Sequence, residues 1–271
     1  MLDEPGGVNV SRDGKRWRRG LRACLLALLT AGLLQGCGGA LMKRVSSVEL
    51  QRAALAAAKD PNTWVPAMGA AVFAVSDWDR QLSDWARREQ PLFGSRADAL
   101  GGSDVLLAIS IGGALGTSLL VPDEGQAPAR PGVQLAALAG TGAATYALKY
   151  SVGRPRPDAS DELSFPSGHS SFAFSGATLT RRNLAQLDLS SPLHTALDAG
   201  TIGLAAATAW ARVEAGVHYP SDVLAGAALG NFVAAMVNDA WLREGGLGEA
   251  DARVSLLPLQ GGALLRVTRY F

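Results

Sequence analysis

Charge, cysteine and metal-binding patterns are scarce in this sequence, and neither sign of charge is in excess. Only 18% of the 271 residues are charged, with 25 Lys and Arg against 24 Asp and Glu, and there are two cysteines. Two cysteines cannot form a disulfide framework, and no Cys/His cluster has the spacing of a zinc site. A net charge of +1 lacks the basic face that nucleic acid requires. The composition therefore argues against a disulfide- or metal-stapled scaffold and against a nucleic-acid partner.

Long uninterrupted membrane spans are also missing, although the chain is 48% hydrophobic. Four stretches rich in Ala, Gly and Leu carry no charge: 105–121, 132–148, 199–211 and 223–237. Each is shorter than the roughly 20 residues that a transmembrane helix needs. Buried helices of a compact bundle have the same composition. A lipid-tethered or membrane-associated bundle is favoured over a fully integral one, because the N-terminal segment carries a lipidation signal that an integral protein would not need.

The N-terminal segment has the features of a bacterial secretory signal. A basic stretch from Lys15 to Arg22 precedes a short apolar run from Leu25 to Leu34. The run ends in Leu34-Gln35-Gly36-Cys37, which resembles the lipobox of bacterial lipoproteins. Residues 1–36 are thus predicted to be a signal peptide, with lipidation at Cys37 and a tether and leading helix over 37–60. An uncleaved anchor helix is the alternative.

A lipidated Cys37 would hold the protein on the periplasmic side of the bacterial envelope. Because Gly38 is not acidic, the resemblance to sorted lipoproteins favours the outer membrane.

The rest of the chain is predicted to be all-α. Helical spacing from Ser46 to Lys59 is followed by helical stretches separated by Gly, Pro and Asp, at about 63–89, 103–121, 132–151, 168–183, 194–213 and 220–243. No strand alternates with them, which indicates a bundle of about six core helices over 61–245. Residues 246–271 form a tail with a predicted β-hairpin. Trp64, Trp78 and Trp85 are expected to pack in the core.

Three clusters in order carry the candidate chemistry: Lys149 to Pro157, Phe165 to Ser170, and Arg212 to Asp222. Their cations adjoin apolar helices, where an unpaired charge is costly, so they require an anion. These cations are Lys149, Arg156 and Arg212. Arginine matches phosphate oxygens with a planar fork, and lysine adds a point charge.

The second cluster predicts another anion-binding element. Pro166 suits the first position of a helix, so Ser167, Gly168 and His169 would offer free backbone N–H groups. Gly168 would also allow a ligand to approach the backbone closely.

Two histidines complete the set. A helix starting near Pro220 would bring Asp222 close to His218, fixing its tautomer and leaving one ring nitrogen as a nucleophile. His169 is placed to protonate a leaving oxygen. His194, between a proline and a helix start, is interpreted as a capping or surface residue. Such chemistry needs neither metal nor cofactor, because the cations and the helix N-terminus supply the electrostatic stabilisation.

The order Lys-x6-Arg-Pro, Pro-Ser-Gly-His and Arg-x5-His-x3-Asp resembles the type 2 phosphatidic acid phosphatase (PAP2) superfamily. That superfamily also includes bacterial nonspecific acid phosphatases and vanadium haloperoxidases, and the resemblance extends from about residue 61 to 243. It implies a phosphate site made by five residues: Lys149, Arg156, Ser167, Gly168 and Arg212.

The same resemblance implies the catalytic roles. His169 would be the general acid, His218 the nucleophile that forms a phosphohistidine, and Asp222 its orienting partner. One departure is Ala211, where the family usually has serine. Arg154 repeats the Arg-Pro step without the six-residue spacing and is the reserve candidate for phosphate binding.

These observations predict a metal-independent phosphatase acting on a phosphomonoester or diphosphate. A lipid tether among apolar helices favours a lipid phosphate, such as phosphatidate, phosphatidylglycerophosphate or isoprenyl diphosphate, over a small soluble phosphoester. The alternatives are a vanadate-dependent haloperoxidase-like enzyme and a non-catalytic envelope lipoprotein.

Overall fold

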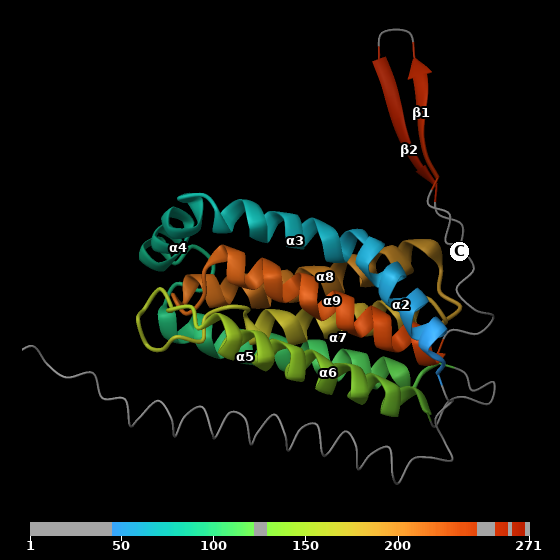
Figure 1. Cartoon of the computed structure of the whole chain (residues 1–271), viewed down its shortest axis with the longest axis horizontal. Coiled ribbons are helices and arrows are strands. Elements are labelled where there is room, and N and C mark those ends of the chain that lie inside the picture. The colour runs from blue at the N-terminus through green and yellow to red at the C-terminus, as the bar shows by residue number, and fades with distance from the viewer. Residues whose placement is uncertain (1–44, 122–128, 243–252, 260–261, 269–271) are drawn as a thin grey trace, which may run out of the picture.

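The computed structural model describes residues 45–121, 129–242, 253–259 and 262–268. The predicted signal peptide, the lipobox and Cys37 lie outside these residues. The described helices are α2 (Ser47–Lys59), α3 (Pro61–Ala74), α4 (Trp78–Glu89), α5 (Arg96–Ser118), α6 (Ala129–Val152), α7 (Gly168–Leu184), α8 (Ser191–Glu214) and α9 (Pro220–Leu242) (Figure 1). Strands β1 (Arg253–Leu259) and β2 (Gly262–Thr268) pair antiparallel, with Arg253 opposite Thr268. The predicted all-α fold is confirmed.

One predicted helix, 63–89, is in fact two. Helix α3 begins earlier than expected because Asp60 caps it, accepting a hydrogen bond from the Asn62 N–H at 2.8 Å. It ends at Ala74, and the Ser76 hydroxyl donates to the carbonyl of Phe73 at 3.3 Å. Serine and aspartate favour such local hydrogen bonds over helix continuation, which explains the break before α4.

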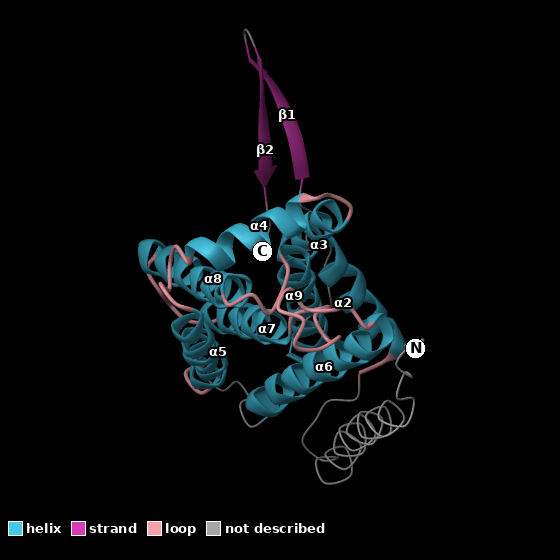
Figure 2. Ribbon diagram, turned by 90° about the vertical axis from the view of Figure 1, so that its left-hand side faces the viewer, coloured by secondary structure: helices cyan, strands magenta, loops and turns pink. Residues whose placement is uncertain are grey.

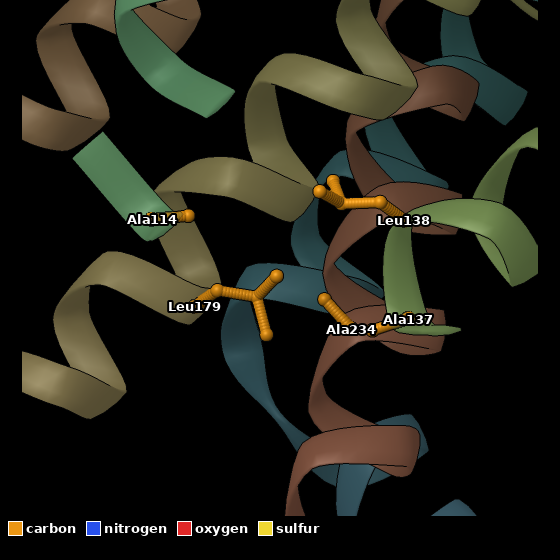
Figure 3. Packing of buried hydrophobic residues seen from close by; sticks show 5 residues of the cluster. All are labelled: Ala114, Ala137, Leu138, Leu179 and Ala234. Atoms are coloured by element: carbon orange, nitrogen blue, oxygen red, sulfur yellow. The ribbon is translucent and has the colours of Figure 1, made fainter. Parts of the chain in front are cut away.

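Helices α7 and α9 form the centre of the bundle. Helix α7 packs against α5, α6, α8 and α9, and α9 also packs against α2 and α3 (Figure 2). A core cluster joins α5, α6, α7 and α9 through small and aliphatic side chains: Ala114, Ala137, Leu138, Leu179 and Ala234 (Figure 3). The many alanines bring the helix backbones close together.

Helices α7 and α9 touch backbone to backbone where two glycines lie. A Cβ on Gly226 would lie 2.6 Å from the carbonyl oxygen of Ser167, and one on Gly230 would lie 2.0 Å from that of Ser171. No larger residue fits at either position without moving a helix. The N-terminal part of α9 is therefore held directly against the N-terminal part of α7.

The expectation that the tryptophans pack in the core is wrong. Trp64, Trp78 and Trp85 are 50%, 60% and 42% exposed. For Trp64 the reason is that α3 turns its small residues inward: Ala70 is buried, and Gly69 lies against Leu224. Trp78 and Trp85 lie on α4, whose buried residues are instead Asp79, Ser83 and Ala86.

Two described helices, α5 and α9, are long and apolar enough to cross a membrane. Helix α9 is mostly buried in the bundle, whereas only 22% of the apolar stretch of α5 is buried. Helix α3 carries no charged residue and exposes Val65, Met68 and Val72. These surfaces favour association with a membrane.

Candidate active site

The candidate site lies at one end of the bundle, where α6 and α8 finish and α5, α7 and α9 begin. The segments 153–167 and 215–219 connect the helices there (left in Figure 1). All three sequence clusters therefore meet at this end, because each lies at a helix terminus or in one of these connections.

Two of the predicted phosphate-binding cations come from the end of α6 and the connection that follows. Lys149 is buried, and its Nζ donates to the carbonyl of Leu163. The Nε of Arg156 donates to Asp161 Oδ1 at 2.7 Å, and its Nη1 donates to the carbonyl of Val217 at 3.2 Å. Asp161 is thus the counter-ion of Arg156, while Lys149 contacts a neutral carbonyl.

Arg212, in the last turn of α8, is a buried cation without a carboxylate partner among the described residues. It is 9% exposed; its Nη1 donates to Ser103 Oγ at 2.9 Å, and its Nε has no hydrogen-bond partner in the described part of the chain. Burial and then the positive charge of Arg156 lower the pKa of Arg212 to about 10. A buried guanidinium that lacks a carboxylate partner favours binding of an anion.

The sequence alone did not indicate that Ser103 belongs to the candidate site. Ala211, where a hydroxyl was expected, is fully buried. The Ser103 hydroxyl on α5 instead contacts the Arg212 guanidinium and donates to the carbonyl of Leu100 at 2.7 Å. A neighbouring helix thus provides a hydroxyl contact for this arginine.

The N-terminus of α7 supplies backbone donors, with one correction to the prediction. Ser167 is the N-cap and Gly168 the first helical residue, so Pro166 precedes the helix. The Ser167 N–H donates to the carbonyl of Asp222 at 2.9 Å, and the expectation that it is free is wrong. The N–H groups of Gly168 and His169 have no acceptor among the described residues, as is usual in a first helical turn.

His218 is buried in the turn between α8 and α9, with 2% of its surface exposed. Its Nδ1 faces Asp222 Oδ2 at 3.8 Å and makes no hydrogen bond within the described residues. Burial lowers the pKa of His218 to about 4, and the charges of Lys149 and Arg156 act in the same direction. The imidazole is therefore neutral near pH 7, the form in which it is a nucleophile.

Asp222, in the first turn of α9, is fully buried and held by several donors. Its Oδ2 accepts from the Tyr219 N–H at 2.8 Å and from the Ser164 hydroxyl, and its Oδ1 accepts from Arg154 Nη1 at 2.7 Å. The predicted proximity of His218 and Asp222 is thus present, and the carboxylate orientation is fixed by residues that the sequence did not indicate for this role.

His169 lies at the start of α7, and its side chain is partly exposed. Its Nε2 lies 2.7 Å from Asp104 Oδ1, a partner on α5 that the sequence reasoning missed. Burial and the charge of Arg212 lower the pKa of His169, and the hydrogen bond with Asp104 opposes this shift. Since Lys149 and Arg212 both act on His169, this histidine shares the site with the cations.

The remaining candidates lie elsewhere or have other partners. Arg154, the reserve candidate for phosphate, bonds to Asp79 and Asp222 instead. His194 lies near the start of α8, at the opposite end of the bundle from the site. Among the described residues, no three His, Cys, Asp or Glu side chains group as metal ligands would.

We expect the Lys149 ammonium to make anion binding depend on pH. Burial and the charge of Arg156 lower the pKa of Lys149 to about 8. We expect the rise in melting temperature caused by sulfate, whose own charge is constant here, to shrink as the pH increases through 8. The unliganded protein should meanwhile gain stability between pH 8 and 10.5, because the unfolded chain keeps this proton longer.

Thermal unfolding with and without sulfate from pH 6.5 to 10 measures both effects. Lys149→Met should show a smaller sulfate effect with a flatter pH dependence. An unchanged pH profile in this variant would contradict the assignment of Lys149 to the anion site.

Buried cations, open N–H groups at a helix start and a neutral buried histidine backed by a carboxylate are the groups expected of a phosphoryl-transfer site, here on an all-α fold. Residues 132–244 match the PAP2 superfamily. The match is confined to this part of the chain, and it supports a phosphoric ester hydrolase.

A solved structure has a similar fold. It is described as the first transmembrane PAP2-type phosphatidylglycerolphosphate phosphatase from Bacillus subtilis. The match has a TM-score of 0.51 and 21% sequence identity, and it covers 66% of this chain and 95% of that one. No curated protein matches this chain.

Proposed function

We propose that the protein is a metal-independent lipid phosphatase that acts through a phosphohistidine at His218. The observation that carries this proposal is the buried, neutral His218, whose Nδ1 faces Asp222. The cations beside it have fewer anionic partners than their charge requires. The cations would bind the phosphoryl oxygens, and they stabilise the negative charge that develops in the transition state.

The geometry supports a two-step reaction. Because Nδ1 of His218 faces Asp222, Nε2 attacks phosphorus while the bond to the leaving oxygen breaks. His169 gives its proton to that oxygen. In the second step water attacks the phosphohistidine, His169 takes a proton from the water, and phosphate leaves with His218 restored. The negative charge of the bound substrate raises the proton affinity of His169 for its acid role.

A lipid substrate is supported by the apolar surfaces. Helix α3 exposes Trp64, Val65 and Met68, and α5 exposes Val105 and Ile109. Exposed apolar surface of this extent is typical of contact with a membrane. With lipidation at Cys37, the protein would act from the periplasmic side of the envelope, with the outer membrane favoured, on a phosphatidate, phosphatidylglycerophosphate or isoprenyl diphosphate.

The test is phosphate release by the full chain in detergent micelles containing EDTA. The substrates are the three lipid classes named above and a water-soluble phosphomonoester. We expect turnover in EDTA, with a lipid substrate preferred at equal concentration. Turnover that stops in EDTA and returns with a divalent metal would contradict the mechanism. Preference for the soluble ester would contradict the lipid assignment.

A further inference from the structure

We propose that Arg154 and Asp79 are positioning residues that hold the Asp222 carboxylate behind His218. The inference rests on the proposed function and extends it to α4, which lies outside the residues that match the PAP2 superfamily. Neither residue is placed among the groups that touch phosphate.

Arg154 uses both terminal nitrogens within this cluster. Its Nη1 donates to Asp222 Oδ1 at 2.7 Å and to Ser221 Oγ at 2.6 Å, and its Nη2 donates to Asp79 Oδ2 at 2.7 Å. The guanidinium also lies 4.2 Å from the centre of the Tyr219 ring. Arginine has a rigid fork, so a side chain bound in this way fixes the orientation of both carboxylates.

Asp79 is the second anchor. It is almost fully buried, and its Oδ1 accepts from the backbone N–H of Ser221 at 2.8 Å while its Oδ2 accepts from the Ser221 hydroxyl at 2.6 Å. It therefore holds the first turn of α9, which carries Asp222, as well as the Arg154 guanidinium.

The arrangement gives each oxygen of Asp222 a separate task. Oδ1 is bound by Arg154, while Oδ2, which also accepts from the Tyr219 N–H and the Ser164 hydroxyl, faces His218 Nδ1 at 3.8 Å. If the bond to Oδ1 is lost, only the donors of Oδ2 hold the carboxylate, so its alignment with His218 Nδ1 loosens and its control of the His218 tautomer weakens. The expected consequence is a slower attack on phosphorus with little change in phosphate binding.

The variants are Asp79→Asn, which preserves shape, and Arg154→Lys, which preserves charge but not the fork. For each we expect kcat to fall by about 10- to 100-fold, the range typical of groups that orient a catalytic ligand. KM and the inhibition constant of inorganic phosphate should change by less than about threefold. Asp84→Asn is the matched control, because Asp84 lies on the same helix and pairs with Arg87 at an exposed site.

Coupling to Asp222 separates positioning from a general structural role. In an Asp222→Asn background, adding Asp79→Asn or Arg154→Lys should lower kcat little further, because all of these changes act through one carboxylate. Additive losses, or losses that follow melting temperature alone, would overturn the inference. A large rise in the phosphate inhibition constant with kcat unchanged would instead make Arg154 a phosphate ligand. An inactive wild-type protein, or an active His218→Ala variant, would refute the proposed function itself.

Discussion

The variant His218→Ala should release phosphate at least about a thousandfold more slowly than the unaltered protein, since loss of a nucleophile removes the covalent route entirely. His218 is the buried imidazole beside Asp222, and no other described histidine has this environment. Phosphate release in EDTA, measured with the preferred substrate, gives the rate.

A second readout follows the intermediate directly. Rapid acid-free quenching with radiolabelled substrate should trap a phosphorylated protein, with the label lost in His218→Ala. His194→Ala is the control, because His194 lies at the start of α8, away from the site, and should keep full activity. Labelling that persists without His218 would place the nucleophile elsewhere.

The variant Arg212→Met should lose activity and gain stability. Arg212 is buried, its Nε has no hydrogen-bond partner among the described residues, and the charge of Arg156 acts against it. Removing one such stabilising donor typically lowers kcat by about 10²- to 10³-fold. Removing an unpaired buried charge should raise the free energy of unfolding by roughly 0.5–2 kcal/mol.

Arg181→Met tests whether these opposite changes are specific to the site. Arg181 pairs with Asp198 at 3.2 Å on the other end of the bundle, so its loss should lower stability and leave activity unchanged. Urea unfolding and kcat/KM for both variants give the comparison. If Arg212→Met is less stable than the unaltered protein, the cation is not held at an energetic cost, and the argument for an anion site weakens.

Much of the site could be predicted because its candidate residues occur in short sequence patterns. The spacing between Lys149 and Arg156, the helix start after Ser167, and the separation of His218 from Asp222 are short-range features. Each lies at a helix end, where the sequence signals are strongest. The structure brings these residues to one end of the bundle, as the patterns indicated.

What the sequence did not reveal depends on long-range packing. Asp79, Ser103 and Asp104 each meet a partner across a large sequence separation, from α4 or α5 to α7, α8 or α9. Nothing in the neighbouring sequence distinguishes these three residues from other polar residues. The exposure of the tryptophans was missed for the same reason, since the face of α3 or α4 that becomes buried depends on the helices packed against it.

The backbone contact of α9 with α7 at Gly226 and Gly230 has a consequence for selectivity. One helix carries His169 and the other carries Asp222, with His218 just before it, so the spacing between the proposed acid and the proposed nucleophile is set by two main chains in direct contact. This spacing is fixed, so the phosphoryl group of a substrate must fit between the two histidines. The remainder of the substrate extends beyond them, and differences in chain length or headgroup are recognised by other surfaces.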